Sequence, residues 1–142
     1  MTIDELADRF FTAIESGDGD TVRAMYADDA VIWHNEDRTV QTVDENLRVL
    51  RWLSRTVAAL RYRDVHRIVH DGGFVQQHVL TGVLTDGTEL SIPAALFVTV
   101  TDGMICRIDE YADSAHLGPL HAIAARRRAA RMQSDSHQKE HT

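Results

Sequence analysis

Several features on which many proteins depend are scarce in this chain of 142 residues, and each scarcity excludes a class of protein. A single cysteine, Cys106, excludes an intrachain disulfide framework, and its position in a predicted strand indicates a buried and unreactive thiol. No apolar run approaches the ~20 residues that cross a bilayer, so we expect no membrane association. The excess of acidic residues gives a formal net charge of -7, which argues against nucleic acid as the main partner. The chain starts directly with a polar helix signal and not with a signal peptide, so we expect a cytoplasmic protein.

The first part of the chain carries the signals of three helices. Thr2 and Glu5 form a capping box, in which the threonine caps the helix and the glutamate reaches back, and Gly17 should end this helix. Thr42 and Glu45 repeat the box and open another helix. The other elements expected here are a short helix capped by Asp20, over Thr21 to about Tyr26, and a brief strand over Ala30–His34.

After Ala59 the spacing of apolar residues changes from helical to alternating, which is typical of strands. Turn sequences with glycine separate four such stretches, and Gly82 and Pro93 mark expected bulges or bends within two of them. Three helices before a long, curling antiparallel sheet indicate an α+β domain with the helices packed on the concave side. The strands predicted are Leu60–His70, Phe74–Leu84, Glu89–Val100 and Met104–Ala112.

The C-terminal part differs from the rest in composition. We expect one domain over residues 1–118, a basic helix over residues 119–132 and a disordered tail over residues 133–142, which are polar and lack apolar anchors. A solvated helix whose positive residues complement its C-terminal dipole explains the basic cluster. An arm that touches RNA or a membrane is the alternative, but it lacks interleaved aromatic residues. The basic residues are Arg126, Arg127, Arg128 and Arg131.

Polar side chains interrupt apolar rows on three of the predicted strands. Because successive side chains of a strand point to opposite faces, Gln76 and His78 lie in the middle of the apolar face of Phe74–Leu84. Glu110 and His34 each continue the apolar face of another strand. Such groups are either hydrogen-bonded core residues or the polar part of a pocket. We favour the pocket, because several polar groups converge.

The order of elements and two motifs carry a resemblance to a known family. Met25–Val31 enters a strand after a short helix, and Asp102–Ile105 leads into Asp109, Glu110 and Tyr111. Over roughly Leu6–Leu117 the chain resembles the nuclear transport factor 2-like superfamily, which includes ketosteroid isomerase, SnoaL-like polyketide cyclases and limonene epoxide hydrolase. The resemblance implies a cone-shaped, curved antiparallel or mixed sheet around N-terminal helices, the α+β barrel or cystatin-like roll. It also implies a homodimer through the outer sheet face.

The resemblance to ketosteroid isomerase carries over only in part. The aspartate general base of that enzyme corresponds to His34 here. Its oxyanion-hole tyrosine corresponds to Phe10, and its protonated aspartate falls near Ala94 or Ala95, none of which can donate a hydrogen bond from its side chain. The resemblance therefore does not imply steroid isomerisation.

The resemblance to limonene epoxide hydrolase is also partial. The Arg-x-Asp pair of that enzyme corresponds to Gln76 and His78, and its last-strand aspartate corresponds to Glu110. The last-strand carboxylate is present as a glutamate, but neither residue of the Arg-x-Asp pair is kept. The resemblance therefore implies a related acid-base reaction and not epoxide hydrolysis by the same residues.

The predicted site has three catalytic residues. We assign His34 as the general base and His78 and Glu110 as the acid or the orienting partner, since an imidazole exchanges protons near neutral pH. Two histidines and a carboxylate would also suit a facial-triad iron site, but no local motif supports one, so we expect no metal and no cofactor. The residues expected to bind substrate are Gln76, Phe10, Tyr26, Ile32 and Leu80, with core packing as the alternative for Tyr26.

Three functions are consistent with this site. The first is a cofactor-independent lyase, isomerase, cyclase or hydrolase that acts on a small, mostly apolar molecule. The second is a binding protein of the same fold that holds a hydrophobic ligand without converting it. The third is an interaction module whose interior is filled with side chains and whose dimer surface or basic tail is the working part. A cavity beside His34 would favour the first two over the third.

Overall fold

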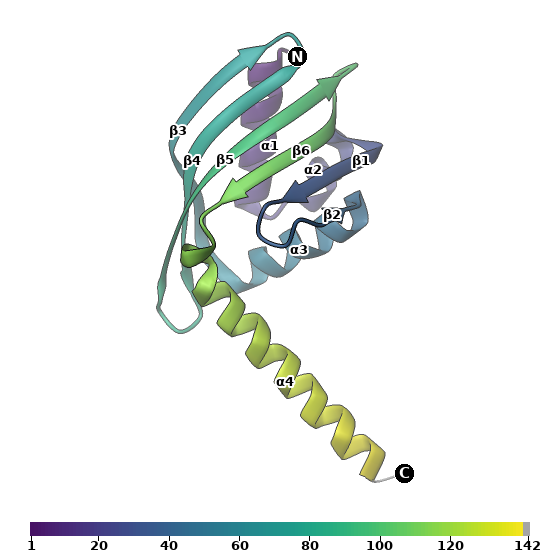
Figure 1. Cartoon of the computed structure of the whole chain (residues 1–142), viewed down its shortest axis with the longest axis vertical. Helices are drawn as coiled ribbons and strands as arrows, with labels where there is room; N and C mark the ends of the chain where they lie inside the picture. The colour runs from purple at the N-terminus through teal and green to yellow at the C-terminus, as the bar shows by residue number, and fades with distance from the viewer. Residues whose placement is uncertain (141–142) are drawn as a thin grey trace.

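The computed structural model of the chain describes residues 1–140, with side chains up to Ser134, and contains a sheet, four α-helices and a short 3-10 helix. The sheet and α1 form two layers, and α4 extends away from them (Figure 1). The elements are α1 Ile3–Ser16, α2 Gly19–Met25, β1 Tyr26–His34, β2 Val40–Gln41, α3 Val43–Thr56, β3 Val57–His70, β4 Gly73–Leu84, β5 Glu89–Thr101, β6 Met104–Ala112, η1 Ser114–Leu117 and α4 Gly118–Glu140.

The sheet has six strands in the order β2-β1-β6-β5-β4-β3. It is mixed, because β1 runs parallel to β6 while the other neighbours are antiparallel. The long strands curve around α1, and α3 crosses near the end of the sheet at which β1 and β6 finish (Figure 1). The predicted α+β fold, a cone-shaped, curved sheet around the N-terminal helices, is confirmed, and the sheet is not closed.

The helix caps explain why the chain turns helical where it does. The hydroxyl of Thr2 accepts the backbone N–H of Glu5, and both bonds of the predicted capping box at Thr42 and Glu45 are present. The predicted cap of α2 was wrong by two residues: Asp18, not Asp20, caps this helix by accepting the N–H of Thr21.

The register shifts of the sheet do not lie at Gly82 or Pro93, where bulges or bends were predicted. The pairing of β4 with β5 continues without a shift through Gly82 and Pro93. The irregularities lie in β3 instead, at Ala59 and Asp64, which have φ values of 54° and 53°. Gly82 is required for a different reason: a Cβ at this position would lie 2.2 Å from a methyl group of Val57. The close approach of β3 to β4 thus requires a glycine.

A further irregularity, between β5 and β6, turns Ile105 fully into the core and leaves Cys106 partly exposed. The expectation that Cys106 is buried was therefore wrong. Simple alternation from Met104 fails here because the register shifts between Thr99 and Val100.

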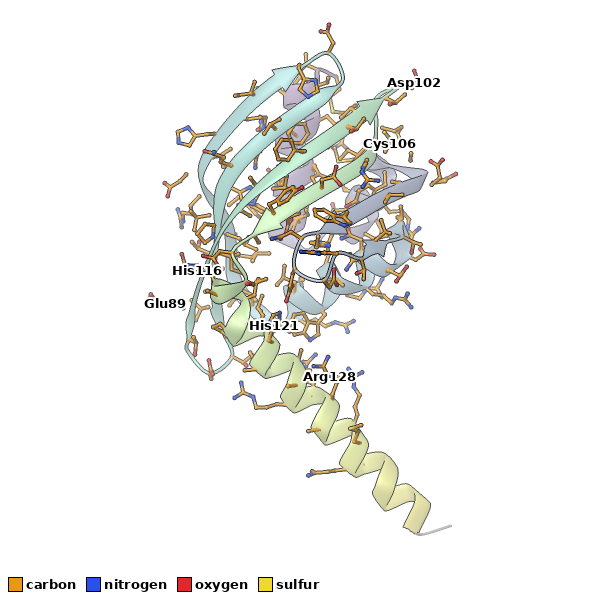
Figure 2. The ribbon with its side chains drawn as sticks, in the orientation of Figure 1. Glu89, Asp102, Cys106, His116, His121 and Arg128 are labelled. Atoms are coloured by element: carbon orange, nitrogen blue, oxygen red, sulfur yellow. The ribbon has the colours of Figure 1, made fainter. Side chains whose placement is uncertain are left out.

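The start of α4 packs on the domain and its remainder leaves it. Ile123 is buried, and Leu117 and Leu120 pack against the same core. An ion pair between His121 and Glu36 joins this first part to the turn after β1. Figure 2 shows His121 near the domain and Arg128 farther along the helix.

The helix α4 is longer than expected. It continues past Met132 to Glu140, so that residues 133–140, for which we expected disorder, extend the helix, and residues 141–142 lie outside the described residues. Neither glycine nor proline follows Pro119 to interrupt it. None of the described helices combines the length and the apolar character needed to span a membrane.

The tight turn between β3 and β4 yields a first prediction. Gly73 has a φ of 147°, and a Cβ there would lie 1.9 Å from the carbonyl oxygen of Val98. We expect Gly73→Ala to lower the free energy of unfolding by about 3 kcal/mol, measured by urea unfolding with tryptophan fluorescence. Gly72→Ala is the matched control, since its Cβ would meet only a ring atom of His70 at 3.5 Å. Equal losses in the two variants would contradict the prediction.

Candidate active site

His34 and Glu110 form a pair at the ends of two neighbouring strands. They are direct partners in the parallel register of β1 and β6, so their side chains emerge on the same face. Nε2 of His34 lies 3.9 Å from Oε1 of Glu110, and the side chains are 25% and 31% exposed. The pair is therefore close enough to interact electrostatically and open enough to exchange protons with solvent.

The environment of Glu110 shifts its proton affinity. Most of the side chain is covered, and this burial raises the pKa of the Glu110 carboxyl above its ordinary value, while His34 opposes the rise by favouring the carboxylate. A carboxyl group balanced in this way can accept or return a proton closer to neutral pH than an exposed glutamate.

Gln76 and His78 lie inside, as alternation along β4 predicted. Their residues are 0% and 5% exposed. The amide nitrogen of Gln76 lies 2.9 Å from Nδ1 of His78, and the amide oxygen accepts the Nε–H of Arg67 at 2.8 Å. Both ends of the Gln76 amide are therefore occupied by protein groups.

Aromatic rings surround His78. Its ring centroid lies 4.6 Å from that of Tyr62 and 5.7 Å from that of Phe11, both with edge-to-face geometry. Burial lowers the pKa of His78 to about 4. The imidazole is therefore neutral at neutral pH, which suits a hydrogen-bonding role better than proton storage.

The apolar residues predicted to bind substrate lie in the interior. Phe10 and Ile32 are both 2% exposed, and Leu80 is partly buried opposite Tyr62 on β3. These side chains could contact a ligand that enters the cone, and their role in binding stays a prediction.

Tyr26 is buried as well, and its hydroxyl is hydrogen-bonded. It donates to Oδ1 of Asn46 at 2.8 Å, and the amide of Asn46 donates to Oε1 of Gln41 at 3.1 Å. Burial raises the pKa of Tyr26, with a smaller contribution from Glu110. The hydroxyl thus stays protonated, with its hydrogen directed to α3.

Two interior residues, Tyr62 and Arg67, were missed by the sequence analysis. They are five positions apart in the chain, so strict alternation would put them on opposite faces of β3. The bulge at Asp64 reverses the alternation, and both side chains face inward. Burial raises the pKa of Tyr62, with Glu110 adding to the rise, so its hydroxyl stays protonated.

The structure thus brings the predicted residues together in two groups. His34 contacts Glu110, and His78 contacts Gln76, but no hydrogen bond or ion pair between described residues joins one group to the other. Among the described residues, one hollow of about 460 Å³ lies between α1, α2 and α3, and another of about 480 Å³ has His78 and Tyr111 in its lining. Neither of them is lined by His34 or Glu110. The interior pocket beside His34 therefore stays a prediction.

No group of three His, Cys, Asp or Glu side chains within the described part of the chain is arranged to hold a metal ion. His34 and Glu110 meet, but His78 is engaged with Gln76 on another strand.

The outer face of the sheet carries a cluster of aromatic side chains. The ring of Tyr111 lies 5.2 Å from that of Trp33 and 6.0 Å from that of Phe97. Tyr111 and Phe97 are 48% and 49% exposed, which is unusual for adjacent large rings.

The fold and the inward polar groups define a class of small curved-sheet α+β domain, and a comparison with family models identifies it. The model described as the SnoaL-like domain matches residues 7–108, so the chain belongs to the SnoaL-like family. The predicted membership of the nuclear transport factor 2-like superfamily is thereby confirmed. No curated protein matches the sequence of this chain.

Solved structures with the same fold are distant in sequence. PrhC from Penicillium brasilianum has a TM-score of 0.77 at 15% identity, covering 90% of this chain and 91% of its own. IdmH from Streptomyces antibioticus, provisionally assigned as a polyketide cyclase, has a TM-score of 0.71 at 20% identity, covering 82% and 95%. A protein of ketosteroid isomerase-like fold from Catenulispora acidiphila, in complex with trimethylamine, has a TM-score of 0.67 at 11% identity, covering 75% and 84%. At these identities the likeness shows the fold alone.

The neutral, buried state of His78 predicts how stability depends on pH. Folding lowers the pKa of this imidazole from 6.5 to about 4, so its contribution is complete above pH 6.5 and is lost as the pH falls through 4. We expect the free energy of unfolding to fall by about 3 kcal/mol over this range from His78 alone, measured by urea unfolding at each pH. His78→Gln should remove this component, and His66→Gln, an exchange of an exposed histidine on β3, is the control. The same pH dependence in His78→Gln and wild type would contradict the prediction.

Proposed function

We propose that the protein is a cofactor-independent acid-base enzyme of the cyclase, isomerase or hydrolase type that acts on a small, mostly apolar molecule. The observation that carries the proposal is the contact of His34 with Glu110 at 3.9 Å, at the partly exposed edge of an otherwise apolar interior. Membership of the SnoaL-like family supports cyclase or isomerase chemistry without a cofactor at the level of the family. A cytoplasmic location, predicted from the sequence, is part of the same proposal.

In this mechanism His34 is the general base. Nε2 faces Glu110, so an ionised carboxylate favours hydrogen on that nitrogen and leaves Nδ1 to accept a proton from the substrate. The imidazolium that forms is stabilised by the carboxylate beside it. Return of the proton to another atom of the same molecule completes an isomerisation or cyclisation without an external reactant.

The substrate would lie against the apolar interior. Phe10, Ile32 and Leu80 supply apolar surface, and the oxygen of Tyr26 can accept a hydrogen bond because its own hydrogen is directed to Asn46. The Gln76 amide is occupied at both ends, so in this proposal it contributes through His78 and not by direct contact.

The other two functions remain testable alternatives, and one observation favours the interaction module. The hollows described above have neither His34 nor Glu110 in their lining, although His78 lines one of them. An interior that admits no ligand would leave the exposed aromatic cluster, or the basic part of α4, as the working surface.

Proton exchange tests the proposal without a known product. We would incubate the protein in D₂O with a panel of small apolar ketones and diketones and measure deuterium uptake by mass spectrometry. We expect protein-dependent exchange that falls by about 100-fold or more in His34→Ala and also falls in Glu110→Gln. His70→Ala, which changes an exposed histidine at the end of β3, should retain exchange.

Two outcomes would count against the enzyme. If ligands bind equally well to the wild type and to His34→Ala and His78→Ala, with no exchange in any of them, the protein holds ligands without converting them. If the panel neither binds nor exchanges, the interaction module gains support.

The outer sheet face supports a homodimer as the partner of this chain. Trp33, Phe97 and Tyr111 form adjacent aromatic contacts with large exposed areas, which a second copy would cover. We expect wild-type protein to have the mass of a dimer in size-exclusion chromatography with light scattering. Tyr111→Glu should have the mass of a monomer, because it places a charge in the buried centre. Val49→Glu, at a 43% exposed apolar residue of α3, is the control that should remain dimeric.

A further inference from the structure

A continuous chain of hydrogen bonds runs from the first turns of α1 to His78. Nη1 of Arg67 donates to Asp4 at 2.7 Å and to Asp8 at 2.8 Å. Nε of the same guanidinium donates to the amide oxygen of Gln76 at 2.8 Å, and the amide nitrogen lies 2.9 Å from Nδ1 of His78. The chain joins α1, β3 and β4 inside the curved sheet.

The direction of every bond in this chain follows from chemistry. A guanidinium has donors and no acceptor, so the group of Gln76 that faces Arg67 is the amide oxygen. The group that faces His78 is then the amide nitrogen, which can only donate. Nδ1 of His78 must therefore accept, and a neutral ring in this state carries its hydrogen on Nε2.

Arg67 is held firmly enough to impose this order. Its side chain is 11% exposed and bonded to two carboxylates of α1. Its guanidinium carbon lies 6.0 Å from the ring centre of Phe11 and 5.7 Å from that of Phe74. A reversed amide would turn its NH₂ group toward these donors and lose the bond, so the observed orientation is strongly favoured.

The other nitrogen of His78 is available. The structure gives Nε2 no hydrogen-bond partner among the described residues, and the same holds for the hydroxyl of Tyr62. Among the described residues, the side-chain polar atom that is both inaccessible to solvent and without a hydrogen-bond partner is the hydroxyl of Thr56. Nε2 of His78 and the Tyr62 hydroxyl also lack a partner, so both of them must be accessible to solvent. Nε2–H therefore reaches accessible space on a ring whose centroid lies 4.6 Å from that of Tyr62.

We infer that Arg67 and Gln76 are positioning residues that hold His78 as a neutral imidazole with its hydrogen on Nε2, so that His78 donates a hydrogen bond to a substrate oxygen and does not act as a base. The assignment of the tautomer stands on the hydrogen bonds alone, and only the substrate contact rests on the proposed function. Protonation of His78 would set an Nδ1–H against the amide NH₂, which agrees with the lowering of its pKa by burial. Tyr62 packs against its ring, and Arg67 reaches it through Gln76. The other titratable groups on the elements packed around it act through these two residues: Asp4 and Asp8 bond to Arg67, while Glu15 and Glu110 act on Tyr62.

Two-bond ¹H–¹⁵N correlation spectra of protein with ¹⁵N-labelled histidine rings test the inference, with the His78 signals assigned by their loss in His78→Gln. In wild-type protein we expect the pattern of a ring with hydrogen on Nε2 throughout about pH 5 to 8. Gln76→Glu offers a carboxylate that accepts from both Arg67 and Nδ1–H, so we expect hydrogen on Nδ1 and titration of His78 within that range. Gln77→Glu adds the same charge at the neighbouring exposed position and should keep the wild-type pattern.

A second variant keeps the test decisive if Gln76→Glu does not fold. Arg67→Met removes the donor that orients the amide, so we expect signals of both neutral forms of His78. Hydrogen on Nδ1 in the wild type, or an unchanged pattern in every variant that folds, would overturn the inference. The spectra need no substrate, so they can support the tautomer assignment even if the exchange experiment shows no enzyme activity. Exchange activity combined with hydrogen on Nδ1 would instead overturn the assignment and leave the proposed function standing.

Discussion

The interior of this protein depends on one buried amide, that of Gln76. The residue has no exposed surface, and a buried amide without partners would cost about 2 kcal/mol or more. Arg67 donates to its oxygen and His78 accepts from its nitrogen, so both ends are satisfied. Because Arg67 also bonds to Asp4 and Asp8, the same arrangement ties β3 and β4 to the first turns of α1. The polar contacts that stabilise the interior are therefore also those that set the state of its histidine.

This arrangement requires a local departure from regular strand geometry. Tyr62 and Arg67 face the interior together only because Asp64 takes a positive φ and inserts a bulge between them. Such bulges bend a strand and increase its twist, which suits a sheet that curves around a helix. The bulge at Asp64 thus helps to curve the sheet and also places the guanidinium of Arg67 within hydrogen-bonding distance of Gln76.

The sequence predicts the fold and much of the candidate site wherever alternation is unbroken. Gln76 and His78 stand in an apolar row of β4, and the continuous pairing of β4 with β5 keeps that row inside. Cys106 was misjudged because a register shift interrupts alternation nearby. The contribution of β3 could not be predicted for the same reason, since nothing in the sequence around Asp64 distinguishes a bulge from a regular strand. Local signals give a similar result. The caps at Thr2 and Thr42 were predicted correctly, although only Thr42 and Glu45 form the complete capping box. Asp18 and Asp20 are equally suitable cap residues by type, and only the path of the chain selects Asp18.

The two interior-facing imidazoles, His34 and His78, have different surroundings, although from the sequence alone either could have been catalytic. His34 lies partly exposed, 3.9 Å from the carboxylate oxygen of Glu110. His78 is enclosed by aromatic rings and meets an amide nitrogen, which disfavours the charged ring twice, through burial and through the bond that Nδ1 must accept. A solvent-accessible ring beside a carboxylate suits a general base, and a ring that stays neutral suits a fixed hydrogen-bond donor. The proposed acid-base reaction uses one group of each kind, and in this proposal both come from the same residue type.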